Sequence, residues 1–179
     1  MKRSAGGIPR SAPRVPMKGF PQLTTEDVQQ LDVLLKDLVS RSGVLSAMVV
    51  ESAGYLIQRA GGELPGDVRE FASLASNAFN AAQAMSKRLK ENFFTQLRIS
   101  GTGFHTLIRH VDDTCLLVVV FDTQIAPEIV ADKAVPTVIN LHTMMELARQ
   151  RAPGATVDFA DSDADNVTKF FRRTPPPES

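Results

Sequence analysis

Four side chains in this sequence have the chemistry of metal ligands or nucleophiles: His105, His110, Cys115 and His142. No pair of them has the spacing that places two metal ligands on one helix face. His105 and His110 lie five residues apart on one predicted strand, so they point to opposite sides of a sheet. Cys115 belongs to the most apolar run of the chain, where a thiol is usually inert. We therefore expect these four side chains to be packed in the core or exposed to solvent, and we expect no metal site.

Asp161, Asp163 and Asp165 alternate as at the start of a calcium-binding loop. The sixth position of such a loop requires glycine and is Asn166 here, and the twelfth requires a bidentate glutamate and is Arg172. The sequence also contains no glycine-rich phosphate loop and no serine in a nucleophile-elbow motif. We therefore expect neither an enzyme nor a cofactor-binding protein.

Charge is unevenly distributed along the chain, although its 20 basic and 20 acidic residues cancel. Residues 1–22 contain five basic side chains, four prolines and no acid, a composition that buries too little apolar surface to offset the entropy of ordering. We expect a disordered arm, either a solubilising tail or an electrostatic tether to nucleic acid, anionic lipid or an acidic protein. Aromatic residues do not alternate with the basic ones, so specific nucleic-acid binding is not indicated.

A single cysteine excludes an internal disulfide and suits a reducing compartment. The basic residues near the N-terminus are not followed by the apolar segment of a signal peptide, and no stretch approaches the roughly eighteen apolar residues of a membrane span. We expect a soluble, cytoplasmic protein with one domain at residues 23–154, between the arm and a tail at 155–179.

The elements that would position a functional surface are organised around residues 115–121, seven consecutive apolar residues between Asp113 and Asp122. A half-exposed strand alternates apolar and polar side chains, whereas an unbroken β-branched and aromatic run predicts a strand covered on both faces. This run therefore predicts a central strand with neighbours on both edges.

A helix and a strand hairpin are predicted near the start of the domain. Thr24 or Thr25 offers an N-cap hydroxyl to a helix whose apolar residues recur at helical spacing. Residues 44–51 and 55–60 are predicted strands, joined by a short link that contains Gly54.

The longest predicted helix, residues 67–92, carries an apolar set of side chains at helical spacing and a second set beside it that contains Phe79. Its many small residues allow close approach to a sheet or to another helix, although alanine is also simply the best helix former. The first set comprises Phe71, Ala75, Ala78, Ala82, Met85 and Leu89, and the second lies beside it and comprises Ala72, Ser76, Phe79 and Gln83.

Three strands, at 94–100, 104–110 and 115–121, are predicted to follow as a meander. Apolar and polar residues alternate in the first of them, which favours an edge position. The last helix is predicted to begin at Pro136, because proline clashes inside a helix but fits its first turn. The predicted buried face of this helix is formed by Val138, Leu141, Met145 and Ala148.

The tail at 155–179 contains one apolar cluster. Val167, Phe170 and Phe171 fall on one side of a short predicted helix, ahead of two arginines and three prolines. Adjacent phenylalanines are costly to leave in water. We expect them to dock, either on this domain or on a partner.

The predicted order of elements is helix, strand, strand, long helix, three strands and helix, which gives a single five-stranded antiparallel sheet flanked by helices in an α/β (α+β) fold. This order resembles the roadblock family (dynein light chain roadblock type) across about residues 24–150. The resemblance rests on Gly43-Val44 before Ala47-Met48-Val49-Val50, Gly54 in the hairpin, the alanine-rich helix at 67–91, and Leu116-Leu117-Val118-Val119-Val120.

The resemblance implies a homodimer, or a heterodimer with a roadblock paralogue, in which the long helices pack together and the edge strands pair. A single domain with extensions at both ends most resembles the bacterial, MglB-type group. The residues that match the dimer contact are Ala72, Ser76, Phe79 and Gln83 on the helix and Thr95, Leu97 and Ile99 on the edge strand.

The resemblance also implies a regulator of a small Ras-like GTPase that lacks nucleotide chemistry of its own. An arginine that enters the GTPase site in trans is worth about a thousandfold, and Arg59, Arg69 and Arg98 are available. One alternative is a scaffold that gathers other proteins through its tails without GTPase regulation. Another is a ligand-sensing domain of the PAS or profilin-like sort, which requires an apolar pocket.

Overall fold

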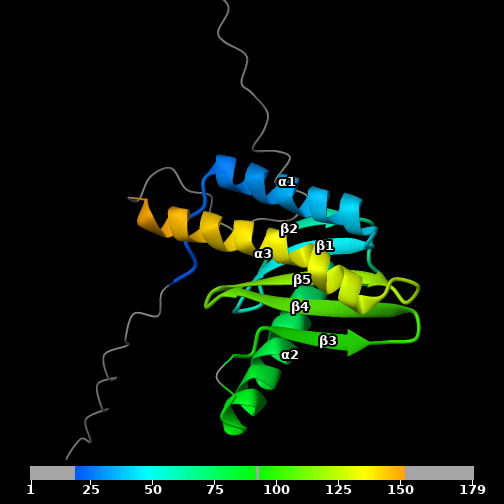
Figure 1. Ribbon diagram of the computed structural model, residues 1–179. Helices are drawn as coiled ribbons and strands as arrows, with labels where there is room; N and C mark the ends of the chain where they lie inside the picture. The colour runs from blue at the N-terminus through cyan, green and yellow to red at the C-terminus, as the bar shows by residue number, and fades with distance from the viewer. Residues whose placement is uncertain (1–18, 92, 152–179) are drawn as a thin grey trace, which may run out of the picture.

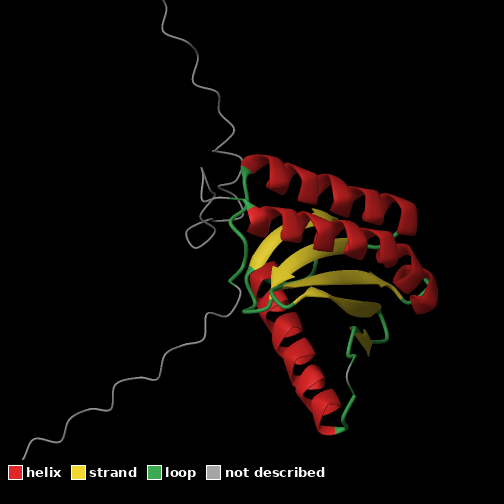
Figure 2. Ribbon diagram, turned by 60° about the vertical axis from the view of Figure 1, so that its left-hand side comes forward, coloured by secondary structure: helices red, strands yellow, loops and turns green. Residues whose placement is uncertain are grey.

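A five-stranded antiparallel sheet forms the middle layer of the protein, with helices on both of its faces (Figures 1 and 2). The computed structural model describes residues 19–91 and 93–151. The predicted fold and order of elements are confirmed. In chain order the elements are α1 (Thr25–Ser42), β1 (Ser46–Glu51), β2 (Leu56–Gly61), α2 (Val68–Arg88), β3 (Gln96–Ser100), β4 (Phe104–Asp112), β5 (Cys115–Asp122) and α3 (Pro127–Gln150).

The strands are arranged in the order β2-β1-β5-β4-β3, so β5 is the central strand and β3 and β2 are the edges. Val118 of β5 pairs with Met48 on one side and with Ile108 on the other. Every residue from Cys115 to Phe121 is buried, as the unbroken apolar run predicts. The expected edge position of the first meander strand is also confirmed.

Two separate cores lie on the two faces of the sheet. The larger core fills the space between the sheet and the pair α1 and α3, which lie side by side (Figure 1). The smaller one lies beneath α2 on the opposite face (Figure 2). Phe20, which falls within the predicted arm, packs against the larger core, so the packed part of the chain begins before residue 23.

Helix α1 begins where its capping residues predict. The Thr24 hydroxyl accepts a hydrogen bond from the Asp27 amide, and the Asp27 carboxylate accepts one from the Thr24 amide at 2.8 Å. Gly43 ends the helix in the left-handed region at φ 68°. Arg151, just beyond α3, donates two hydrogen bonds to Asp27, so the start of α1 is tied to the end of α3.

The predicted start of the last helix at Pro136 is wrong, because α3 begins at Pro127 and passes through Pro136. A proline inside a helix removes one backbone hydrogen bond. Contacts on both sides of Pro136 offset this loss: Arg41 of α1 donates to the Lys133 carbonyl at 2.8 Å and to the Thr137 hydroxyl at 2.9 Å. Residues on both sides of Pro136 are also buried in the core: Val130, Ala134, Leu141 and Met145.

Residues 1–18 of the arm and the tail at 155–179 lie outside the described residues, so the division into arm, domain and tail stays a prediction. The same holds for docking by Val167, Phe170 and Phe171. Within the described residues, no helix combines the length and apolar character needed to cross a membrane.

Candidate protein-interaction site

The helix residues predicted to meet a partner lie inside the chain. Ala72, Ser76 and Phe79 face the sheet and are at most 1% exposed. The Phe79 ring lies 5.1 Å from that of Phe94 and stacks on His110. These three side chains therefore pack in the core of the single chain, and their part in a helix-to-helix contact stays a prediction. Gln83, the fourth predicted residue, is half-buried.

Another part of α2 exposes large apolar side chains. Leu74 is 60% exposed, Met85 65% and Leu89, at the end of the helix, 77%. Together with Ala78 and Ala81 they lie within about a quarter of the helix circumference, because steps of three and four residues return to the same side. We call these five residues the α2 stripe. The stripe lies beside the buried face of the helix, not opposite it.

The C-terminal part of α2 extends past the edge of the sheet on the side of β3, as both views show (Figures 1 and 2). The sheet therefore cannot cover this part of the helix. Lys90 ends the helical run with a positive φ of 61°, and Phe93, in the link to β3, is 88% exposed. Large apolar groups in such a position are typical of a protein contact surface.

Strand β3 supplies the second part of this surface. It pairs only with β4, so its other edge carries unpaired backbone groups that can pair with another strand. Thr95 is exposed, Leu97 is half-buried against the core beneath α2, and Ile99 is 46% exposed. Leu97 and Ile99 lie on the α2 side of the sheet, because Leu97 pairs with Ile108 of that core. The α2 stripe and β3 together form the α2–β3 surface.

Sequence reasoning predicted β3 as an edge strand but did not predict the α2 stripe as a contact surface. The periodic set that contains Met85 and Leu89 was visible in the sequence, and the structure divides it between the core and solvent: Ala75 and Ala82 are buried while Met85 and Leu89 are exposed. No signal in the sequence marked Leu74 as exposed.

The three candidate arginines lie on three different elements. Arg59 of β2 donates to the Gly62 carbonyl at 2.9 Å. Arg69 lies in the first turn of α2. Arg98 of β3 forms an exposed ion pair with Glu128 at 2.8 Å. Because β2 and β3 are opposite edges of the sheet, Arg59 and Arg98 lie apart, so the three arginines do not form one site.

The residues with catalytic or ligand chemistry do not form a reactive centre within the described part of the chain. No group of three His, Cys, Asp or Glu side chains is arranged there to hold a metal ion. His105 packs edge-on against Phe121 and His110 stacks on Phe79, which confirms that the two histidines point to opposite faces. Burial raises the pKa of the Cys115 thiol well above its usual value, so the thiol stays protonated and unreactive.

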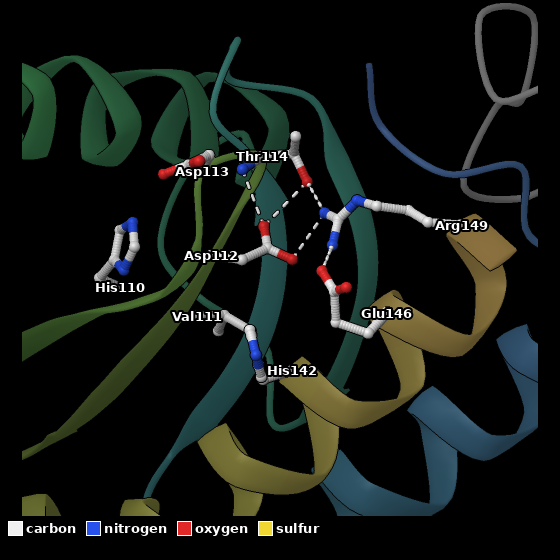
Figure 3. A pocket seen from close by; sticks show the side chains of 8 residues that line it. All are labelled: His110, Val111, Asp112, Asp113, Thr114, His142, Glu146 and Arg149. Carbon is white, nitrogen blue, oxygen red and sulfur yellow. Dashed lines mark hydrogen bonds and ion pairs between the residues drawn. The ribbon is translucent and has the colours of Figure 1, made fainter. Parts of the chain in front are cut away.

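A pocket of about 260 Å³ lies where the β4–β5 turn meets the end of α3 (Figure 3). Arg149 lies within it and donates to Asp112 at 2.7 Å, to the Thr114 hydroxyl at 2.6 Å and to Glu146. Thr114 also donates to Asp112 through its amide and its hydroxyl. His110 lies apart from this group (Figure 3). The network ties the central hairpin to α3, which is a structural role.

The ion pair in this pocket predicts a pH dependence of stability. Burial raises the pKa of Asp112, but the hydrogen bonds from Arg149 and Thr114 outweigh burial and hold the pKa below its usual value. The ionised carboxylate therefore stabilises the fold above the unfolded pKa of about 3.9, and this contribution is lost as the pH falls through the folded pKa.

We expect Asp112→Asn to reduce the free energy of unfolding by about 1–2 kcal/mol at neutral pH, since one charged partner of a buried network is lost. The difference from wild type should shrink below about pH 4. Urea unfolding at a series of pH values checks this, with Asp113→Asn as the exposed control. A difference that stays constant from neutral to acid pH would rule out the ion pair as its source.

These features define a class of protein: a domain with one antiparallel sheet between helices, an unpartnered apolar helix stripe beside a free sheet edge, and no reactive centre in its described part. The family model described as Roadblock/LC7 domain matches residues 30–121, more than half of the chain. The chain belongs to the Roadblock/LC7 domain family.

Solved structures of MglB have the same fold. The structure described as "MglB with tetrameric arrangement" has a TM-score of 0.67 and 20% identity, and the match covers 72% of this chain and 96% of that one. The gliding protein MglB from Thermus thermophilus has a TM-score of 0.66 and 19% identity, with 71% and 96% covered. Myxococcus xanthus MglB has a TM-score of 0.67 and 21% identity, with 73% and 98% covered. No curated protein matches the sequence. At these identities the likeness is one of fold.

Proposed function

We propose that this chain pairs with a second copy of itself, or with another roadblock chain, through the α2–β3 surface. The observation that carries the proposal is the exposed α2 stripe, which extends past the sheet next to the free edge of β3. A second copy offers the same stripe and the same edge, so one two-fold contact satisfies both. A protein of this fold is described with a tetrameric arrangement, which supports self-association.

The paired protein regulates a small Ras-like GTPase in the cytoplasm, as the resemblance to the bacterial MglB-type group implies. Its own chain contains no phosphate-binding loop, so the GTPase supplies the nucleotide site. The regulator acts by binding one nucleotide state more tightly than the other, since equal affinity for both states shifts no equilibrium. The regulator acts indirectly, by remodelling the switch loops of the GTPase, and nothing singles out one of Arg59, Arg69 and Arg98 as an arginine that acts in trans.

The test is a pull-down from lysate of the source organism with the full-length protein as bait. One arm contains a non-hydrolysable GTP analogue and the other contains GDP, and mass spectrometry identifies what is recovered. We expect a small GTPase in the GTP-analogue arm only. Equal recovery of the same GTPase in both arms would defeat the regulator proposal.

The same experiment separates the regulator from the scaffold. A scaffold recovers the same non-GTPase partners in both arms, and loses them when residues 155–179 are deleted while the core dimer remains. The sensor alternative requires an apolar pocket with a bound small molecule, which native mass spectrometry of the full-length protein would show.

A further inference from the structure

Helix α3 exposes apolar side chains on the side that faces away from the sheet. Ile129 is 50% exposed, Val135 39%, Ile139 58% and Leu147 55%. At 3.6 residues per turn these four lie within about a third of the helix circumference, and we call them the outer strip. An apolar stripe on a helix whose other side is already buried indicates a second contact.

Helix α1, in the same layer, differs from α3 in this respect. Its outward positions are polar, with one exception, Val33, which is 63% exposed. Isolated exposed apolar residues of this kind are ordinary. The outer strip is therefore a property of α3 and not of the whole helical layer.

The chain itself continues from the end of this strip. Arg151 follows Leu147 by four residues, and α3 ends at Gln150. The strip is about 27 Å long, since 18 residues separate Leu147 from Ile129 at 1.5 Å each. The 19 residues from Arg151 to Phe170 span up to about 60 Å when extended, so the apolar cluster of the tail can reach any part of the strip.

Charge favours a return of the tail antiparallel to α3. The first part of α3 carries Glu128 and Asp132, and the tail cluster is flanked by Lys169 and Arg172-Arg173. An antiparallel return brings these opposite charges together.

We infer that the C-terminal segment binds the outer strip of its own chain, with Val167, Phe170 and Phe171 as the apolar contacts. The covalent link supplies an effective concentration on the order of millimolar, so even a weak intrinsic affinity gives substantial occupancy. The inference does not depend on GTPase regulation or on pairing through the α2–β3 surface.

A spin label on the tail of the full-length protein tests this contact. The label is attached to Thr174→Cys, because the native Cys115 is buried and unreactive. We expect a loss of methyl NMR intensity relative to Val33 of α1 that is greatest at Ile129 and decreases through Ile139 to Leu147, and recovery of that intensity in the Phe170→Ala, Phe171→Ala variant. Equal intensities at the strip and at Val33 would overturn the inference.

A mixed sample identifies which chain the tail contacts. Spin-labelled chains without isotopes are combined with isotope-labelled chains that lack the spin label, so that only contacts between chains reduce the observed intensity. We expect no selective loss at the strip in this sample. If the outer strip loses as much intensity in the mixed sample as in the sample whose chains carry both labels, the tail binds the strip of a second copy. That result would overturn the assignment to the same chain.

Discussion

The Leu89→Glu variant is expected to stay folded and to lose self-association. Leu89 is 77% exposed and lies just beyond the last turn of α2, so a glutamate there costs the isolated chain little. In a pair formed through the α2–β3 surface, the new carboxylate would be buried without a partner. We expect a penalty on the order of 3 kcal/mol, which is more than a hundredfold in the dissociation constant.

Sedimentation velocity over a range of concentrations measures this effect. Wild-type protein should sediment as a species of twice the 19.5 kDa chain mass, and Leu89→Glu should sediment as a single chain. Ala84→Glu is the matched control, because Ala84 is exposed on α2 about a quarter turn from the stripe. If Leu89→Glu sediments like wild type, the α2 stripe is not the contact.

Phe79→Ala is expected to reduce the free energy of unfolding by about 3–5 kcal/mol, the usual cost of removing a buried phenylalanine. Phe79 is 1% exposed and packs on Phe94 and His110, so its loss opens a cavity beneath α2. The measurement is urea unfolding in the Leu89→Glu background, where stability does not depend on protein concentration.

Two further variants make this result decisive. Phe79→Leu keeps most of the volume and should lose about 1 kcal/mol, which stays measurable if Phe79→Ala does not fold. Met85→Ala, on the exposed stripe, should change stability by less than about 0.5 kcal/mol. A small loss of unfolding free energy for Phe79→Ala, together with weaker self-association of Phe79→Ala in the otherwise wild-type chain, would place Phe79 in the interface.

Much of the fold could be predicted from local signals in the sequence. The unbroken run at 115–121 predicted the central strand because only a strand covered on both faces has no polar positions. The Thr24 cap and Gly43 predicted the ends of α1. The start of α3 was not predictable in the same way, since the contacts of Arg41 with Lys133 and Thr137 that flank Pro136 join residues more than ninety positions apart.

The candidate site was predictable only in part. The alternation at Thr95, Leu97 and Ile99 predicted an edge strand, and β3 is one. On α2, helical spacing shows which residues share a side but not which side meets the sheet, because both sets contain small residues and a phenylalanine. That choice depends on where the helix crosses the sheet and how far it extends past β3, which no short-range pattern specifies.

The central claim is that the paired chain regulates a small GTPase, and single-turnover hydrolysis tests it most directly. The GTPase recovered by pull-down is loaded with GTP, and its hydrolysis rate is measured against increasing concentrations of the full-length protein. We predict that the rate changes and saturates with wild type, and that Leu89→Glu has no effect at the same concentrations. A rate that stays at its intrinsic value with saturating wild-type protein would contradict regulation of hydrolysis, and an equal change with Leu89→Glu would contradict the need for pairing.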